Sequence, residues 1–374
     1  MQLEKRNKTL WYLPLEVYRE RYTWYMSCVN GWAEDNFTKL GISFQRINGV
    51  ESSKEITAGV VLDAYGRSVY AMSQIERIIE EIQKGNVKDD DVIYTEDFWH
   101  PGIESLFYIR TVTRKKFKIG CFLHAQSVDK WDFTYPMRKW IRDIERGYSK
   151  GYDYVFVTSK ILKGLCRKAG FKNIYFVGLP YNNIRLQQQL QEEGFVPYTK
   201  EDFVLFSSRF DKEKNPYFFL DLVDRCKDIQ FKLVNPRGSR SISNDAEVCK
   251  QLDYMLKDSC NLEVVDTRNK LDYYTLLSRA KVQFNCARQD WVSWTLLEAI
   301  TFGCNVVYPK WRDFPLELKE CPDSLYKNED IKDAEKKLRY AMTSGHDMSL
   351  YDIVHKHDNS WTRYLQIMGF IKGE

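Results

Sequence analysis

The sequence is poor in the residues that build metal centres and disulfide frameworks. Among 374 residues it has only five histidines, and its nine cysteines are scattered, odd in number and never spaced as Cys-x-x-Cys. Structural zinc sites and disulfide-stapled secreted folds depend on such clusters, so both classes are excluded and a reducing compartment is favoured. No carboxylate pair has the spacing of a metal site either. We therefore predict neither a metal nor a cofactor.

Long apolar runs are also missing. No stretch approaches the roughly 18 consecutive apolar residues that a membrane-spanning helix needs. The polar start of the chain has no secretory signal. These absences predict a cytoplasmic protein without a membrane span, and nothing in the sequence indicates an oligomeric state.

Charge is distributed unevenly along the chain. Residues 110–172 contain sixteen Lys/Arg and five Asp/Glu, a local balance of +11. Because the whole chain carries +4, the remainder carries −7. Such polarisation predicts a face that meets a polyanion or an anionic surface.

Strand-like and helix-like segments alternate twice along the chain. The pattern predicts strands at 9–15, 42–47, 91–94, 118–124, 154–158, 174–177, 203–207, 231–234, 262–265, 282–285 and 305–308. It predicts helices at 72–83, 137–146, 217–226, 271–279, 294–302, 330–341 and 360–369. This rhythm is typical of α/β domains with doubly wound parallel sheets. We predict one domain at 1–185, a Gln-rich connection at 185–193, a second domain at 200–344, and a tail at 345–374 packing back on the first.

Open parallel sheets bind ligands beyond the carboxyl ends of their strands, so strand-to-helix junctions are the informative positions. After the predicted strand at 203–207, a polar loop brings Arg209 and Lys214 to the start of a helix. Two cations five residues apart across such a turn can converge on a diphosphate. A solvated surface loop has the same composition, so this junction alone decides nothing.

Two further junctions in the second half support a nucleotide site. Residues 290–304 open a helix at Ser293 or Thr295, whose backbone N–H groups can hold phosphate oxygens. Glu298 lies about one turn into this helix, with a carboxylate suited to paired ribose hydroxyls. The junction at 265–268 is placed to touch a nucleobase. Together the three junctions predict a nucleotide-binding site made of Arg209, Lys214, Thr267, Arg268, Ser293, Trp294, Thr295 and Glu298.

The order and spacing of these motifs resemble the retaining GT-B glycosyltransferases. Members of that family carry an Arg/Lys pair after the first strand of the C-terminal domain, then a Glu–seven residues–Glu motif, then a Gly-x-Pro-Val-type turn. Here seven residues separate Asp290 from Glu298, and Gly303 begins the corresponding turn. The resemblance covers residues 203–309 and implies a GT-B fold of two Rossmann-like domains facing a central cleft. It also implies transfer of a hexose or pentose, with retention, from a nucleotide sugar, for which a uridine diphosphate sugar is expected.

The resemblance also implies a role for each matching residue. Arg209 and Lys214 are expected to grip the diphosphate, Glu298 to bind ribose, and Asp290 to lie beside the donor sugar. Electrostatic stabilisation of the leaving diphosphate would be the main task of such a site. Two departures stand out: Asp290 is one methylene shorter than the usual Glu, and the familiar Gly-Gly loop after the first strand is missing. Glu16 and Arg19 occupy that loop instead and are candidates for acceptor contacts.

The first half contributes candidate catalytic residues at its own strand ends. His124 ends the strand at 118–123, where the family often has a histidine that contacts the donor sugar; a structural role is equally expected. Glu96 and Asp97 follow another strand, and either carboxylate can serve as the acceptor-side base. His100 follows them as a candidate at the acceptor entrance. The histidines of the tail, His355 and His357, are predicted on the surface.

The acceptor is the least constrained part of the prediction. In the basic region, Lys115, Lys116, Trp131 and Tyr135 interleave positive charge with aromatic rings, as nucleic-acid surfaces do, although such rings can equally be core. The first half is also similar to bacteriophage-encoded glycosyltransferases, which implies a hydroxymethylated pyrimidine in phage DNA as acceptor. A surface polysaccharide or glycolipid acceptor is the alternative enzyme hypothesis. A non-catalytic nucleotide-sugar or DNA-binding module is the alternative from another class.

Overall fold

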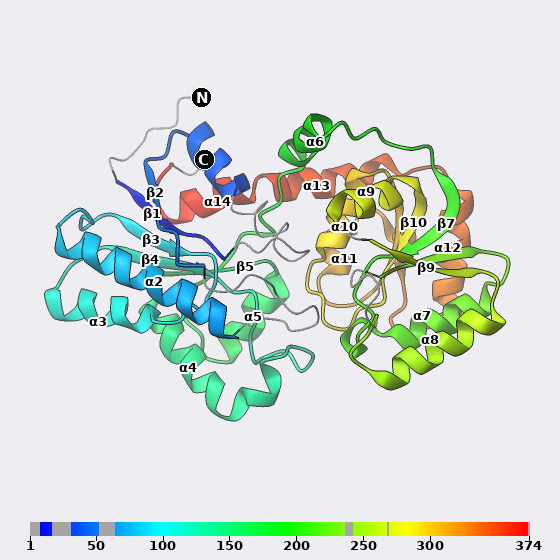
Figure 1. Ribbon diagram of the computed structural model, residues 1–374, viewed down its shortest axis with the longest axis horizontal. Helices are drawn as coiled ribbons and strands as arrows, with labels where there is room; N and C mark the ends of the chain where they lie inside the picture. Colours follow the sequence, from blue (N-terminus) through cyan, green and yellow to red (C-terminus); the bar gives the residue numbers. More distant parts are fainter. Residues whose placement is uncertain (1–7, 17–30, 52–63, 236–241, 268, 373–374) are drawn as a thin grey trace. The chain divides into compact units, whose positions relative to one another are not determined.

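The computed structural model describes residues 8–16, 31–51, 64–235, 242–267 and 269–372. The chain divides into two compact units (Figure 1). Residues 1–180 with 359–374 form the first unit, and residues 181–358 form the second. The chain therefore crosses between units at 180/181 and 358/359, whereas the sequence predicts boundaries near 185–200 and 345.

The first unit is built on a six-stranded sheet with the order β2-β1-β3-β4-β5-β6. Every pairing in it is parallel. Its strands are β1 (Leu10–Leu13), β2 (Phe44–Arg46), β3 (Val92–Thr95), β4 (Lys118–Phe122), β5 (Tyr154–Val157) and β6 (Ile174–Phe176). The short apolar runs of β1, β3, β4 and β5 are largely buried on both faces, as a covered parallel sheet requires, whereas Gln45 and Arg46 of the edge strand β2 are exposed.

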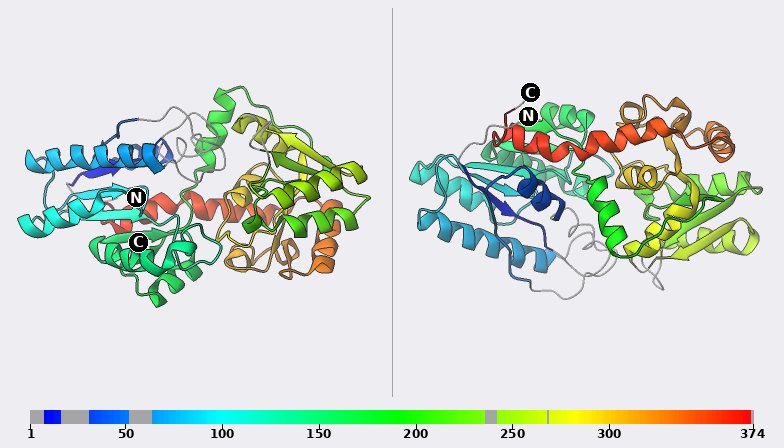
Figure 2. Two further views of the ribbon diagram at one scale, coloured as in Figure 1. Left: turned by 60° about the horizontal axis from the view of Figure 1, so that its bottom comes forward. Right: turned by 90° about the horizontal axis from the view of Figure 1, so that it is seen from above.

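Alternation along the strands sends side chains to two helical layers. Tyr94, Phe122 and Phe156 point to one face, where each ring contacts Tyr364 of α14 (Ser360–Ile367). The helical residues 31–39 lie on the same face, where Phe37 contacts Trp361 of α14, and right-handed crossovers put four further helices on the other face. These are α2 (Ala64–Gln83), α3 (Ile103–Thr113), α4 (Arg138–Gly151) and α5 (Lys160–Lys168). Seen from above in Figure 2, strands of the sheet lie between α14 and α2.

The second unit has a six-stranded parallel sheet with the order β12-β11-β10-β7-β8-β9. Its strands are β7 (Glu201–Phe206), β8 (Gln230–Asn235), β9 (Leu262–Asp266), β10 (Ala280–Phe284), β11 (Asn305–Pro309) and β12 (Leu325–Tyr326). Its helices are α6 (Asn183–Glu192), α7 (Pro216–Arg225), α8 (Ala246–Asp258), α9 (Lys270–Arg279), α10 (Trp294–Thr301), α11 (Phe314–Glu317), α12 (Ile331–Thr343) and α13 (Tyr351–Asp358). A buried core of Phe206, Phe219 and Phe231 joins the sheet to α7.

Two predictions about the chain segments are wrong. The Gln-rich segment forms helix α6 within the second unit rather than a connection between the domains, because Leu186 and Leu190 are spaced to bury one face. His357 is buried rather than on the tail surface: its Nε2 lies 3.2 Å from Glu317 Oε2. In the described part of the chain, no helix is both long and apolar enough to cross a membrane.

Candidate functional site

The strand order of the second unit reverses between β7 and β10. From β7 the chain proceeds through β8 to β9 in one direction, and then from β10 to β11 and β12 in the other. The helices that follow β7 and β10 therefore pack on opposite faces of the sheet. Open α/β sheets bind ligands in the crevice at the carboxyl end of such a reversal. The Arg209–Lys214 loop follows β7, and Asp290 follows β10. Topology thus places both predicted motifs at one position.

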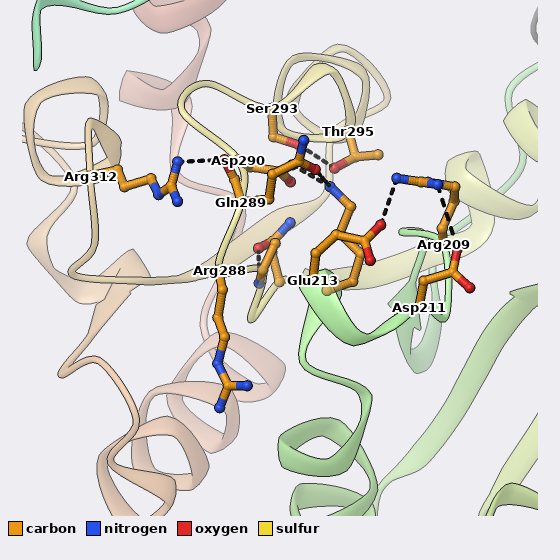
Figure 3. Close-up of polar contacts among 12 residues, drawn as sticks. Arg209, Asp211, Glu213, Arg288, Gln289, Asp290, Ser293, Thr295 and Arg312 are labelled. Carbon is orange, nitrogen blue, oxygen red and sulfur yellow. Dashed lines mark hydrogen bonds and ion pairs between the residues drawn. The ribbon is translucent and has the colours of Figure 1, made fainter. Parts of the chain in front are cut away.

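Backbone contacts hold these two loops against each other. The N–H of Arg288, in the loop after β10, donates to the carbonyl oxygen of Glu213 at 2.9 Å. Asn215 has φ 58°, in the left-handed region, and turns the chain into α7, whose first residue is Pro216. As a result, the Lys214 ammonium donates to Asp290 and lies 3.3 Å from Gln289 Oε1 (Figure 3).

Charge at the site is paired in the absence of ligand. The Lys214 and Asp290 side chains are 11% and 15% exposed, so their ion pair is largely withdrawn from water. Arg209 is more open at 40%, and its guanidinium donates to Glu213 at 2.6 Å and lies 3.5 Å from Asp211. The carboxylates keep both cations oriented, and a diphosphate would compete for the same N–H groups.

The amino terminus of α10 adjoins this pair. Ser293 precedes the helix, but its hydroxyl meets Thr295 Oγ1 at 2.6 Å and caps no backbone N–H. Thr295 Oγ1 also lies 3.4 Å from the Tyr308 hydroxyl. Trp294, the first helical residue, packs its ring 5.9 Å from that of Tyr181. Because Ser293 does not cap the helix, its first turn is suited to an anion.

Glu298 lies one turn further along α10 and is buried. Its carboxylate accepts hydrogen bonds from Lys270 Nζ at 2.6 Å and from the hydroxyls of Tyr273 and Tyr274 at 3.1 and 3.0 Å. All three donors come from α9. Sequence reasoning missed Lys270, although its position directly before the predicted helix at 271–279, after a strand end, is a usable signal. A ribose bound by Glu298 would share the carboxylate with this cation.

The third predicted junction is only partly described. Thr267 follows β9 and is buried, and its N–H donates to the carbonyl oxygen of Asn235 at 3.0 Å. Asn235 in turn donates to Asp266 at 2.8 Å. Arg268 lies outside the described residues. Its predicted contact with a nucleobase stays a prediction.

The first unit has its own point of strand-order reversal, between β1 and β3. The loops after these strands carry Glu16 and Asp97, which are both buried and both paired with Arg67 of α2. Glu16 Oε1 lies 3.3 Å from the guanidinium, and Asp97 also accepts from the Trp99 N–H at 3.1 Å. Arg19 lies outside the described residues. Asp97 is therefore held in an ion pair, as Glu16 is.

Glu96 and His124 lie together at the carboxyl ends of β3 and β4. Burial raises the pKa of the Glu96 carboxyl to about 8, and the Tyr12 hydroxyl contacts it at 2.9 Å. His124 Nε2 lies 2.9 Å from the carbonyl oxygen of Glu96, which can only accept, so the proton is on Nε2. The ring is exposed to solvent, but the surrounding protein still desolvates it and lowers its pKa to about 4. Nδ1 of a neutral imidazole is then an acceptor for a hydroxyl.

His100 is buried between two partners. Its Nε2 lies 3.1 Å from Gln74 Oε1, and its Nδ1 lies 3.2 Å from the carbonyl oxygen of Pro101. Burial, followed by the nearby Arg67, lowers the pKa of its imidazole to about 3. Both nitrogens are engaged, so this placement favours a structural role over the predicted acceptor contact.

The predicted acceptor residues do not lie together. Lys115 and Lys116 precede β4, at the amino end of the sheet, whereas His124 follows β4 at the carboxyl end. At about 3.3 Å per residue the strand separates the two ends by more than 15 Å. Trp131 and Tyr135 lie in the loop after β4, on the same side as His124. Both rings are partly buried beside cations, Lys130 at 5.3 Å and Arg138 at 4.2 Å.

Sequence reasoning also missed Arg312. It follows β11 with φ 52°, a left-handed conformation that is uncommon for residues other than glycine. Its guanidinium donates to the carbonyl oxygen of Gln289 at 2.7 Å (Figure 3). The guanidinium also lies 4.1 Å from the centre of the Trp291 ring. Arg312 therefore braces the loop that carries Asp290. No motif in the sequence marks this position.

Comparisons with known proteins identify the fold. No protein-family model and no curated protein sequence matches the chain. Among solved structures, sucrose-phosphate synthase from Thermosynechococcus elongatus is similar at TM-score 0.62 and 12% identity, over 97% of this chain and 95% of that one. A UDP-forming α,α-trehalose-phosphate synthase from Burkholderia xenovorans matches at TM-score 0.62 and 10% identity, over 99% and 100%.

A third structure was solved with a nucleotide sugar. An Anabaena protein in complex with UDP-glucose matches at TM-score 0.55 and 10% identity, over 96% of this chain and 95% of that one. At these identities the similarity concerns the fold alone. The chain has the GT-B fold, with two six-stranded parallel sheets flanked by helices, and this confirms the fold class predicted from the sequence.

Proposed function

We propose that the chain is a glycosyltransferase whose second unit binds a nucleotide-activated sugar. One observation carries the proposal: the β7 loop puts Lys214 against Asp290 of the β10 loop, beside the uncapped start of α10, at the point where strand order reverses. The fold supports it, because the similar structures include a UDP-forming synthase and a complex with UDP-glucose. We infer a uridine diphosphate sugar as the first donor to test.

The contacts suggest how the donor would be held. A diphosphate at the start of α10 would draw Lys214 from Asp290 and Arg209 from Glu213, exchanging carboxylates for phosphate oxygens. Asp290 would then be free to accept a hydrogen bond from a sugar hydroxyl. Glu298 would bind the ribose from inside the crevice. Cations already oriented before the reaction stabilise a developing diphosphate charge at no cost of reorganisation.

In the first unit neither candidate base is a free carboxylate. Glu96 is buried and protonated at neutral pH according to its raised pKa, and Asp97 is paired with Arg67. This arrangement supports a retaining mechanism in which the donor phosphate takes the acceptor proton. His124, with Nδ1 as an acceptor, would orient a hydroxyl rather than carry charge.

The acceptor stays a proposal with two classes. DNA is supported by Trp131 and Tyr135 near the carboxyl end of β4. Lys115 and Lys116 lie at the amino end of this strand and cannot contribute to the same binding surface. A hydroxymethylated pyrimidine has no further support in the structure. A surface polysaccharide or glycolipid is the other class, and a glycolipid is supported by the exposed apolar side chains that lie among the cations of α4 and α5.

A donor screen tests the proposal. The protein is incubated with a panel of nucleotide sugars, and thermal stabilisation and slow release of nucleoside diphosphate are measured. We expect one nucleotide class to raise the melting temperature and to be hydrolysed, and Glu298→Gln to abolish both effects. Asp202→Asn, which removes an exposed carboxylate at the amino end of the same sheet, is the matched control and should change neither. Equal responses of both variants would contradict the assignment.

A further inference from the structure

Helix α4 exposes an apolar stripe rather than burying all of its apolar side chains. Ile141, Glu145 and Ser149 face the unit. On the flank of the helix beside these residues, Trp140 is 56% exposed and Ile144, one turn later, is 36% exposed. A tryptophan and an isoleucine four residues apart on a helix surface form one contact face. Neither is needed for the core of the unit.

Helix α5 repeats this arrangement. Leu162 and Cys166 are buried, while Ile161 and Leu165, also four residues apart, are 38% and 37% exposed. The two helices are neighbours on one side of the first sheet (Figure 1). Arg146 of α4 donates to the carbonyl oxygen of Ala169, just after α5, at 2.7 Å. The two helices therefore border one surface, which we call the α4–α5 face.

Positive charge surrounds these stripes. Residues 138–172 contain ten Lys/Arg and three Asp/Glu. Two of the acids are occupied: Glu145 is buried and accepts two hydrogen bonds from Ser127, and Asp153 pairs with Arg110 and Lys118. Only Asp143 remains at the surface, beside Arg146. The α4–α5 face is therefore strongly basic.

Several of its cations have nothing to neutralise them. Within the described part of the chain, the side chains of Lys139, Lys150, Arg167 and Lys168 form no ion pair or hydrogen bond. Helix α2 of the same unit differs, since its exposed surface carries Glu76, Glu80 and Glu81. The surface that exposes Trp140, Ile144, Ile161 and Leu165 thus also carries an excess of positive charge, which the surface of α2 does not.

We propose that the α4–α5 face docks this protein on the surface of a lipid bilayer that contains anionic lipids. Free lysines and arginines beside apolar side chains are the composition of helices that lie in the membrane interface. The cations attract anionic headgroups, while the tryptophan and the aliphatic side chains enter the boundary of the acyl chains. Nucleic acid would account for the charge but offers nothing for exposed Ile144, Ile161 and Leu165 to bury against. The proposal does not depend on the transferase activity.

Vesicle co-sedimentation tests the docking. The full-length protein is mixed with vesicles of phosphatidylcholine alone or of phosphatidylcholine with phosphatidylglycerol, at two salt concentrations. We expect binding only to the anionic vesicles, weakening as salt screens the headgroups. Lys139→Gln with Lys150→Gln should weaken it on the order of 25-fold, at about fivefold per cation. Trp140→Ala with Ile144→Ala should weaken it at least about tenfold through the lost apolar contact.

Matched controls separate docking from net charge and from folding. Lys250→Gln with Lys257→Gln changes the net charge equally on exposed α8 of the second unit and should leave vesicle binding unchanged. Circular dichroism should show each variant folded. Binding to duplex DNA but not to vesicles, or no binding to either, overturns the proposal. Vesicle binding that the α4–α5 variants do not weaken also overturns it. The same holds if the protein has no affinity for vesicles but self-associates, and Trp140→Ala abolishes this self-association.

Discussion

Replacing Lys214 by glutamine should lower both the stability of the protein and its affinity for nucleotide, for different reasons. Removing one partner of a fully buried ion pair costs about 3–5 kcal/mol. The Lys214 and Asp290 side chains are 11% and 15% exposed, so water can solvate part of the charge left on Asp290. We therefore expect the free energy of unfolding to fall by about 2–3 kcal/mol. A charge-assisted hydrogen bond to phosphate contributes about 1.5–3 kcal/mol, which is about 10- to 150-fold in affinity.

A second substitution separates the two effects. Lys214→Gln combined with Asp290→Asn leaves no buried charge unpaired, so the free energy of unfolding in urea should return to within about 1 kcal/mol of the original. Calorimetric affinity for a nucleoside diphosphate should stay weak. Lys281→Gln, at an exposed ion pair with Asp202, is the control and should cost at most about 1 kcal/mol with no effect on binding. A double variant that binds nucleoside diphosphate as tightly as the unmodified protein would refute the assignment of Lys214.

Three further predictions follow from single side chains. Arg209→Ala should weaken nucleoside diphosphate binding in calorimetry by about 1.5–3 kcal/mol without altering the urea midpoint, since its pair with Glu213 is partly exposed; unchanged affinity would contradict its role. Arg312→Gly should relieve the left-handed backbone yet loosen the Asp290 loop, so KM for the nucleotide sugar should rise while stability holds; a large loss of stability would oppose this account. Burial raises the Glu96 pKa from 4.5 to about 8, so its contribution to stability is full below pH 4.5 and is lost as the pH rises to 8. Across this range the free energy of unfolding in urea should fall by a few kcal/mol more in the unmodified protein than in Glu96→Gln, at about 1.4 kcal/mol per pKa unit. Parallel pH profiles of the two proteins would contradict the burial argument.

The periodicity of the sequence was sufficient for the sheets because parallel strands are short, apolar and bounded by polar turns. Among the residues that the structure describes, all eleven predicted strands overlap observed ones, and only the two-residue β12 was missed. Helices with mixed surfaces were harder to recognise. α3 was missed because its apolar residues are spread around the helix, and α6 because glutamine is common in connections as well as helices. α5, α8 and α13 were missed as well. Such helices are decided by tertiary packing rather than by local pattern.

The residues of the proposed donor site could be grouped from the sequence because they lie at strand ends. Arg209, Lys214, Asp290 and Glu298 could be placed at one edge of a sheet because parallel strands share their carboxyl ends. The partners of these residues could not be predicted. Lys270 reaches Glu298 from α9, and the backbone of Arg312 adopts a conformation that no local signal indicates.

The acceptor prediction shows a different limit. The charge count over residues 110–172 assumed that this stretch of sequence forms one surface. A strand, however, places the loops before and after it at opposite ends of the sheet. Lys115 and Lys116 were therefore grouped with Trp131 although β4 separates them. A charge count cannot show that every fourth residue of α4 is buried. This burial pattern identifies the face that carries the excess charge.

Hydrogen–deuterium exchange with and without a nucleoside diphosphate tests the central claim most directly, because it locates the ligand on the chain without relying on any substitution. Bound diphosphate should engage the loops after β7 and β10 and the first turn of α10. We predict slower exchange of backbone amides in residues 207–215 and 286–297, with little change in residues 201–206 of β7, whose amides are already protected within the sheet. Slowed exchange confined to the first unit, or none in either loop at saturating nucleotide, would contradict the proposal that the second unit binds the donor.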